Sequence, residues 1–111
     1  MSPLQIAPLP AAQDAAALEL LDQAFASDPT LAWYLFHEQP GYAQRRRAYL
    51  QIYQDLHRAN HLPSLAAWQA GHLLGVSYYN PGRQPISPAS LQQAGEAIGE
   101  HCGASSLERL D

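Results

Sequence analysis

Apolar residues at helical spacing appear first in the segment from about Ala11 to Ala26. Leu18, Leu21 and Phe25 recur at intervals of three and four residues, and such a stripe is typical of an α-helix that buries one face. Asp14 stands in the first turn, where the helix dipole favours a negative charge. The pattern predicts an amphipathic helix here.

Shorter signals surround this helix. The alternating, proline-flanked residues 4–9 predict a short edge strand, because proline cannot donate to an interior ladder. Downstream, Asp28 can cap a second helix that has Pro29 at its first position and ends by Pro40. A third helical pattern covers about residues 42–60 and ends before a proline.

A β-hairpin follows the third helix. Residues 64–69 and 72–79 are two short β-rich runs, and they are joined by a turn at Ala70 and Gly71. The second run carries apolar side chains on both of its faces. We therefore expect it to be a central strand covered on both sides, with its second partner strand beyond the last residue of the chain.

The C-terminal segment is predicted to be helical. Ser87 and Pro88 are suited to start a fourth helix. Ser105, followed three residues later by Glu108, has the pattern of a capping box and predicts the start of a fifth. Because the chain stops within about two turns of that start, and isolated helices so short are marginal, we expect the fold to continue beyond it.

The order of these elements indicates the fold class. One strand, three helices, a hairpin and a helical segment predict an α+β domain, an α/β mixed sheet that is at least partly antiparallel. With 111 residues the chain has room for one core. We expect residues 1–111 to be a single incomplete domain.

Composition narrows the function classes. The chain is 47% hydrophobic and 14% charged, unlike disordered chains. Its net charge of −4 argues against a nucleic-acid partner, and the run Arg45–Arg47 is best explained as a solvated helix face. The N-terminus has neither a basic segment nor a long apolar run, so we expect no membrane span and a cytoplasmic location, which the single cysteine also suits.

Other chemistry-bearing residues give weaker signals. His57 and His61 have the i, i+4 spacing that can place two imidazoles on one helix face and hold zinc. No third ligand follows, and histidines near a helix C-terminus are favoured by the dipole in any case. Cys102 has no basic neighbour in sequence except a histidine, and we interpret it as an inert thiol.

Two stretches together resemble a known family. The run LPAAQDAAALELLDQAFASDP, followed by GHLLGVSYYNP, is similar to the N-terminal half of a GNAT-superfamily N-acetyltransferase. The resemblance covers residues 4–82, and residues 83–111 look like a helical segment that some branches insert before their fourth strand. It implies a partial GNAT-like fold without the later strands, from an enzyme that transfers acetyl from acetyl-CoA to a small-molecule or peptide amine.

One departure from the family bears on activity. The Gly-x-Gly form of the superfamily's cofactor signature, Arg/Gln-x-x-Gly-x-Gly, has no counterpart, since no two of the seven glycines are separated by a single residue. That loop would place a pyrophosphate on backbone N–H groups at a helix N-terminus. We therefore expect this chain to bind no cofactor strongly and to be inactive by itself, with catalytic residues that the sequence does not identify.

By resemblance, this half contributes one wall of the acceptor pocket. The candidate substrate-binding residues are Phe25, Asp28, Trp33, Tyr34, Tyr78 and Tyr79. Several also have a structural explanation: Phe25 as a core residue, Asp28 as a helix cap, and Tyr78 and Tyr79 as buried side chains. Trp33 and Tyr34 cannot both face the core of a short helix, so we expect one of them near the surface or a cleft. Since successive residues of a strand point to opposite faces, at most one of Tyr78 and Tyr79 lines a given pocket.

A second hypothesis is a non-catalytic interaction module. An open strand edge at residues 76–79 would present unpaired N–H and C=O groups, and such an edge can bind another chain or associate with itself. Both hypotheses require the hairpin, and they differ in whether the edge belongs to an interrupted enzyme fold or to an interface.

Overall fold

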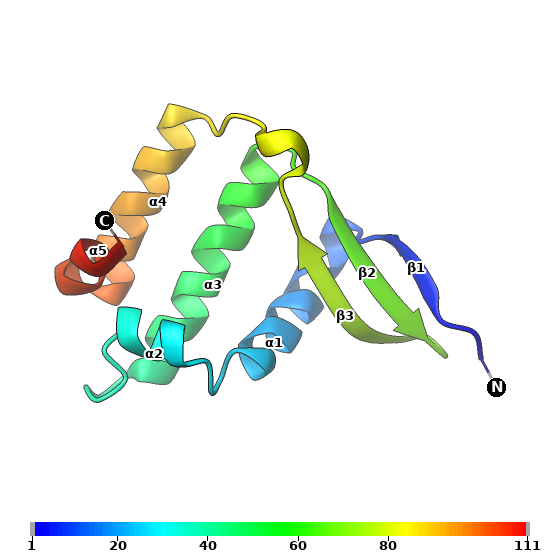
Figure 1. The fold of residues 1–111 in the computed structure, drawn as a ribbon, viewed down its shortest axis with the longest axis horizontal. Coiled ribbons are helices and arrows are strands. Elements are labelled where there is room, and N and C mark those ends of the chain that lie inside the picture. The colour runs from blue at the N-terminus through cyan, green and yellow to red at the C-terminus, as the bar shows by residue number, and fades with distance from the viewer. Residues whose placement is uncertain (1, 111) are drawn as a thin grey trace.

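A three-stranded sheet at one end and a group of helices at the other form the structure of residues 2–110, a computed structural model (Figure 1). The strands are β1 (Gln5–Pro8), β2 (Ser64–Gln69) and β3 (His72–Tyr78), in the order β1-β2-β3 with both pairings antiparallel. This arrangement confirms the predicted α+β class, and β1 is the edge strand that its prolines indicated.

The helices follow the predicted pattern closely. Their bounds are η1 (Ala11–Gln13), α1 (Asp14–Ala24), α2 (Pro29–Tyr34), α3 (Tyr42–Ala59), η2 (Pro81–Arg83), α4 (Pro88–Cys102) and α5 (Ala104–Leu110). No helix within residues 2–110 is both long enough and apolar enough to span a bilayer.

Two of the three predicted helix caps are confirmed. The Asp28 carboxylate accepts a hydrogen bond from the backbone N–H of Leu31 at 2.9 Å, and the Ser87 hydroxyl accepts one from the N–H of Ser90 at 3.4 Å. The capping box at Ser105 is wrong. Because Gly103 adopts φ +96° and separates α4 from α5, the last helix already begins at Ala104 and Ser105 lies inside its first turn.

The hairpin turn has the chemistry that its strands require. Ala70 and Gly71 both have positive φ, 52° and 79°, as in the type I′ turns whose twist matches that of the flanking strands. Farther along, the register shifts between Ala67 and Trp68, so that Leu74 lies unpaired in a β-bulge.

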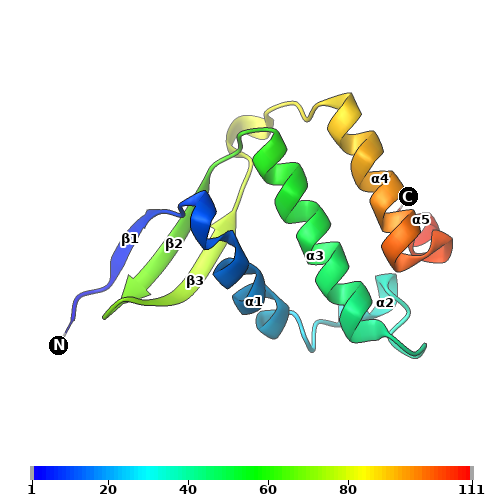
Figure 2. The same cartoon turned by 180° about the vertical axis from the view of Figure 1, so that it is seen from behind.

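The second partner expected for residues 72–79 lies outside the described residues, so their place as a central strand stays a prediction. β3 pairs with β2 alone among residues 2–110, and β2 takes the central place. Figure 2 shows α1 lying across one face of the sheet, whereas Figure 1 shows the other face with no helix over it. Apolar residues on both faces of a strand thus indicated two surfaces suited to burial, of which the described residues cover one.

Two apolar clusters share α1. The larger joins the helices and contains Leu18, Leu31, Leu35, Leu50, Ile52, Ile98 and Cys102. The smaller lies between α1 and the sheet and contains Leu9, Ala17 and Ala66, with Trp68, Leu73, Val76 and Tyr78 packed against it. Adjacent residues of α1, Ala17 and Leu18, belong to different clusters, so this helix connects the sheet to the helical part.

The arginine run is not a solvated face, contrary to the sequence interpretation. Arg45 donates to backbone carbonyls of the loop after α2, Arg46 pairs with Asp22 at 2.7 Å, and Arg47 pairs with Glu19. The carbonyls bound by Arg45 belong to Leu35, Phe36, Gln39 and Pro40. Each guanidinium connects α3 to another segment, because the preceding chain folds back alongside this helix.

Candidate functional site

A cleft opens where α1, α3 and β3 meet. Its volume is about 380 Å³, and we call it the β3 cleft. Its lining residues are Leu21, Phe25, Leu50, Tyr53, Gln54, His57, Val76, Ser77 and Tyr78. Most of these side chains are apolar or aromatic, and none carries a carboxylate.

The cleft lies beside backbone groups that the sheet leaves free. The N–H of Tyr79 donates to the carbonyl of Pro63, the residue before β2, at 3.3 Å. The backbone groups of Tyr79 therefore face the β2 side. In an antiparallel ladder, residues alternate between facing the paired strand and facing away. The backbone groups of Val76 and Tyr78 consequently point outward from β3, on the side away from β2.

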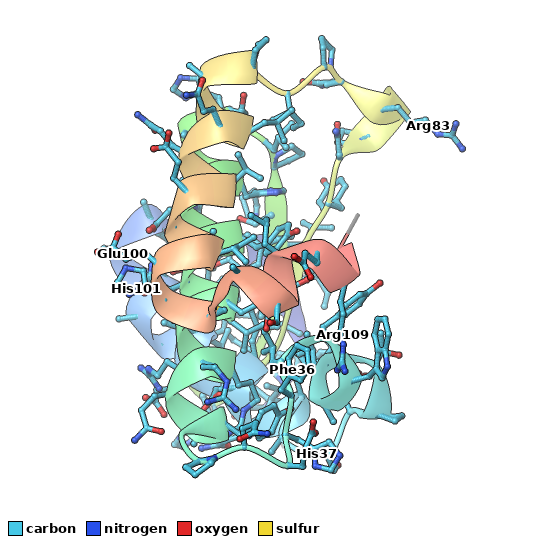
Figure 3. The ribbon with its side chains drawn as sticks, turned by 90° about the vertical axis from the view of Figure 1, so that its left-hand side faces the viewer. Phe36, His37, Arg83, Glu100, His101 and Arg109 are labelled. Atoms are coloured by element: carbon cyan, nitrogen blue, oxygen red, sulfur yellow. The ribbon has the colours of Figure 1, made fainter. Side chains whose placement is uncertain are left out.

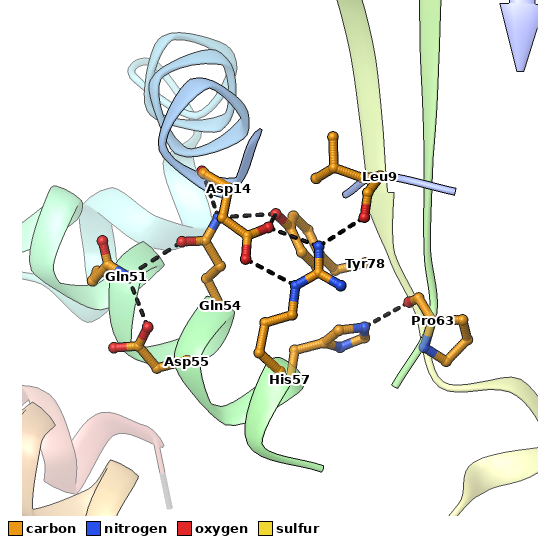
Figure 4. A network of polar contacts seen from close by, with 9 residues as sticks. Leu9, Asp14, Gln51, Gln54, Asp55, His57, Pro63 and Tyr78 are labelled. Atoms are coloured by element: carbon orange, nitrogen blue, oxygen red, sulfur yellow. Dashed lines mark hydrogen bonds and ion pairs between the residues drawn. The ribbon is translucent and has the colours of Figure 1, made fainter. Parts of the chain in front are cut away.

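A hydrogen-bonded cluster centred on Asp14 adjoins the β3 cleft, whose lining it shares through Gln54 and Tyr78 (Figure 4). The Asp14 carboxylate accepts two hydrogen bonds from Arg58, at 2.8 Å each, and a third from the Tyr78 hydroxyl at 2.6 Å. Paired hydrogen bonds between a guanidinium and a carboxylate fix both position and orientation. The start of α1, the last turns of α3 and the end of β3 are thereby joined.

Gln54 and Leu9 complete the Asp14 cluster. The buried Gln54 amide donates to the Asp14 backbone carbonyl at 2.8 Å and to the Tyr78 oxygen at 2.9 Å. Arg58 also donates to the Leu9 carbonyl at 3.1 Å. The Tyr78 hydroxyl therefore donates one hydrogen bond and accepts another, and its polar group is fully used within the protein.

The electrostatics of the Asp14 cluster hold its members in one protonation state at neutral pH. The hydrogen bond from Arg58 lowers the pKa of Asp14 below its usual value, against the opposing effect of burial. Burial, and then the hydrogen bond to Asp14, raise the pKa of Tyr78 to about 12. Asp14 is thus an anion and Tyr78 a neutral phenol, so neither is suited to exchange protons near pH 7.

His57 is the one imidazole in the lining of the cleft. Its Nε2 lies 2.6 Å from the Pro63 carbonyl oxygen. Because a carbonyl can only accept, this contact assigns the proton to Nε2, and in the neutral ring it leaves Nδ1 as the basic nitrogen. The ring also meets Tyr78 edge-on, with centroids 5.2 Å apart.

His57 and His61, whose spacing suggested a zinc site, do not share a helix face. α3 ends at Ala59, and His61 follows it with φ +55°. No group of three or more His, Cys, Asp or Glu side chains suited to a metal ion occurs within residues 2–110. Cys102 is buried, and burial raises the pKa of its thiol, as an unreactive cysteine requires.

Two of the six candidate acceptor residues come together in the β3 cleft. Phe25 follows the last residue of α1 and Tyr78 ends β3, and both line the cavity although 53 positions separate them in sequence. Phe25 also packs against the helical cluster. The Phe25 side chain therefore both packs against the helical core and lines the cleft.

The other four candidates lie elsewhere. Asp28 caps α2, and Tyr34 packs against the helical cluster. Trp33 is 53% exposed beside α5, where the Arg109 guanidinium lies 4.6 Å from its ring centroid and also covers Phe36. Figure 3 shows Arg109 and Phe36 close together. Tyr79 lies past the end of β3 and is 38% exposed, outside the cleft lining.

Sequence reasoning missed Tyr53, Gln54 and His57 as cleft residues. The spacing of Tyr53 and His57 places both on one side of α3, and this spacing was the available signal. The sequence does not show that β3 lies across the cleft from these residues, because that contact depends on how the hairpin packs against α3.

No protein-family model, curated protein or solved structure matches this chain. The function must therefore be argued from the site itself.

Proposed function

We propose that this chain forms the amine-binding side of a GNAT-type N-acetyltransferase fold. The observation that carries the proposal is the β3 cleft, an apolar and aromatic cavity at the free edge of the third strand of an antiparallel sheet. The order of strands and helices, together with the residue patterns that resemble the family, supports it. The acetyl donor would have to be held by structure outside this chain.

The helix starts do not offer the family's glycine turn for the pyrophosphate of acetyl-CoA. Such a group needs free N–H donors at a helix N-terminus. The N-cap of α3 is Gly41, with neither a capping side chain nor an acid in the first turn, but no Gly-x-Gly follows. The one Gln-x-x-Gly-x-Ala run, residues 92–97, lies inside α4 and not at a helix start. Asp14 stands in the first turn of α1, Asp28 occupies the N-cap of α2, and Ser87 that of α4. Two of these positions place a negative charge where the phosphate would lie. No transfer step can be derived from these residues alone.

An organic amine suits the β3 cleft better. Leu21, Leu50 and Val76 supply an apolar wall for a hydrocarbon arm. An ammonium group is attracted to the faces of aromatic rings. Arg58 already lies 5.6 Å from the Tyr78 ring centroid, which leaves Phe25 and Tyr53 as the rings that a bound cation can meet.

The test uses the 111-residue chain labelled with ¹⁵N and titrated with phenethylamine, an aromatic primary amine. We expect amide shifts at Phe25 and at residues 76–78, weaker ones with 2-phenylethanol, and none with acetyl-CoA. Tyr53→Ala should weaken amine binding at least fivefold, because it removes an exposed aromatic face. Leu91→Ala, on the exposed side of α4, is the matched control and should bind as the unmodified chain does.

Two results would contradict the proposal. Amine-induced shifts confined to residues outside the cleft would place binding elsewhere. Saturable shifts with acetyl-CoA would show that the helix starts hold a pyrophosphate after all.

The interaction module is the second candidate. It is favoured by one observation, the free edge of β3, where the backbone groups of Val76 and Tyr78 point outward. An extended peptide could add there as a fourth strand. This candidate predicts binding of extended peptides without any preference for an amine. Titrating the ¹⁵N-labelled chain with an extended peptide that lacks a free amine would distinguish it from the amine-binding proposal.

A further inference from the structure

The sheet face opposite α1 is apolar, and no segment of residues 2–110 covers it. We call it the bare face; its residues are Ile6, Leu65, Ala67, Gly75 and Ser77, which the strand register brings together. Ile6 is 60% exposed and Leu65 is 39% exposed. Leu4 and the bulged Leu74, both more than half exposed, lie near its margins. None of these seven residues is charged.

The bare face is also hollowed. A depression of about 230 Å³ lies over it, lined in part by Ile6, Leu65 and Gly75. A Cβ added at Gly75 would meet no atom within 4 Å. Large aliphatic side chains thus lie next to a depression on the same surface. When two such surfaces face each other, the side chains of one can enter the depression of the other.

The molecule exposes more surface than its mass predicts. A compact monomer of 12.2 kDa has an accessible surface of about 6,100 Å², whereas this chain exposes 7008 Å². The radius of gyration, 15.1 Å, likewise exceeds the value of about 13 Å expected for 111 residues. The excess of about 900 Å², counted over the whole molecule, is as large as the area of about 800 Å² that one partner buries in a standard stable interface.

We propose that the bare face binds the bare face of a second copy of this chain. Two three-stranded sheets would then stack about 10 Å apart, as in a β-sandwich. A two-fold contact requires a surface complementary to itself, and an uncharged face with both ridge and hollow meets that requirement without repulsion between like charges. This inference is independent of the proposed function.

The test is sedimentation equilibrium of the 111-residue chain over a range from about 1 to 300 µM. The unmodified chain should be a dimer that dissociates on dilution. Leu65→Asp and Gly75→Glu should each raise the dimer dissociation constant at least tenfold, because each introduces a charge into the stacked faces. Leu91→Asp, at a leucine that is 51% exposed on α4, is the matched control and should leave the dimer unchanged.

Folding and the amine site are checked on the same variants. Gly75→Glu has open space in the monomer, so its circular dichroism should match that of the unmodified chain, and Ile6→Asp is a second exposed substitution if Leu65→Asp fails to fold. A monomer at 300 µM would overturn the inference, as would a dimer that persists in both Gly75→Glu and Ile6→Asp. Monomeric variants should still show the cleft shifts with phenethylamine, so failure of one proposal is distinguishable from failure of the other.

Discussion

Asp14 makes more connections between the helices and the sheet than its place in the sequence indicates. As an acid in the first turn of α1 it was expected to interact with the helix dipole. In the structure it also accepts hydrogen bonds from Arg58, 44 residues away, and from Tyr78, 64 residues away. One side chain therefore joins three elements, and its removal should affect the whole fold.

Asp14→Asn should lower the free energy of unfolding at pH 7 by about 1.5–3 kcal/mol, the range for hydrogen bonds to charged groups. The pH dependence gives a sharper test. Because the folded-state pKa of Asp14 lies below its ordinary value, its stabilisation is complete above about pH 4–5 and is lost as the pH falls through the folded pKa. Urea unfolding at pH 7 and below pH 4 measures both effects.

Asp55→Asn is the matched control for this measurement. Asp55 is exposed, and its side chain accepts a hydrogen bond from Gln51, four residues away on the same helix. Its substitution should change stability by less than about 0.5 kcal/mol. Equal losses in the two variants, or an unchanged acid dependence in Asp14→Asn, would contradict the role assigned to Asp14.

At the scale of elements, the caps of α2 and α4 differ in quality. α2 has only six residues, and helices this short are not stable by themselves. Its Asp28 cap is short, at 2.9 Å, whereas the Ser87 cap of α4 is exposed and long, at 3.4 Å. The shorter helix therefore depends more on its cap.

Asp28→Ala should cost about 1 kcal/mol, the typical effect of losing a good N-cap. Ser87→Ala should cost about half as much or less, because its hydrogen bond is longer and solvated. Asp28→Asn should retain most of the stability, since asparagine caps equally well. Denaturant midpoints of the three variants give the order of their stability losses. A larger loss of stability in Ser87→Ala than in Asp28→Ala would show that hydrogen-bond length does not rank these caps.

At the scale of the whole molecule, stability is unevenly distributed. α3 packs against both α1 and α4 and contributes Leu50, Ile52 and Gln54 to the interior. All four residues of β1 are exposed, and this strand pairs on one side only. Few buried contacts and solvent-exposed hydrogen bonds are the conditions under which a segment opens locally.

Amide hydrogen exchange should reflect this difference. We expect the amides of residues 50–54 in α3 to exchange at least about a hundredfold more slowly than those of β1 in a sample dilute enough to be monomeric. Exchange followed by ¹⁵N NMR measures it residue by residue. Similar protection in the two segments would mean that the sheet and the helices unfold as one unit.

The sequence by itself determined the local elements of this protein. The amphipathic stripe of α1, the aspartate and proline that start α2, and the turn residues of the hairpin were sufficient to place them. These signals are reliable because each acts between residues only a few positions apart, through helix periodicity, capping and allowed φ values.

Only the tertiary structure decided what each element meets. It paired β3 with β2 alone among residues 2–110, joined Asp14 to Arg58 and gave the arginines of α3 their partners. It also brought Phe25 and Tyr78 together in the cleft lining and left Trp33 and Tyr79 outside it. An apolar pattern states that a face favours burial, but it does not state which segment buries it. That choice depends on contacts between residues tens of positions apart, for which local physics supplies no signal.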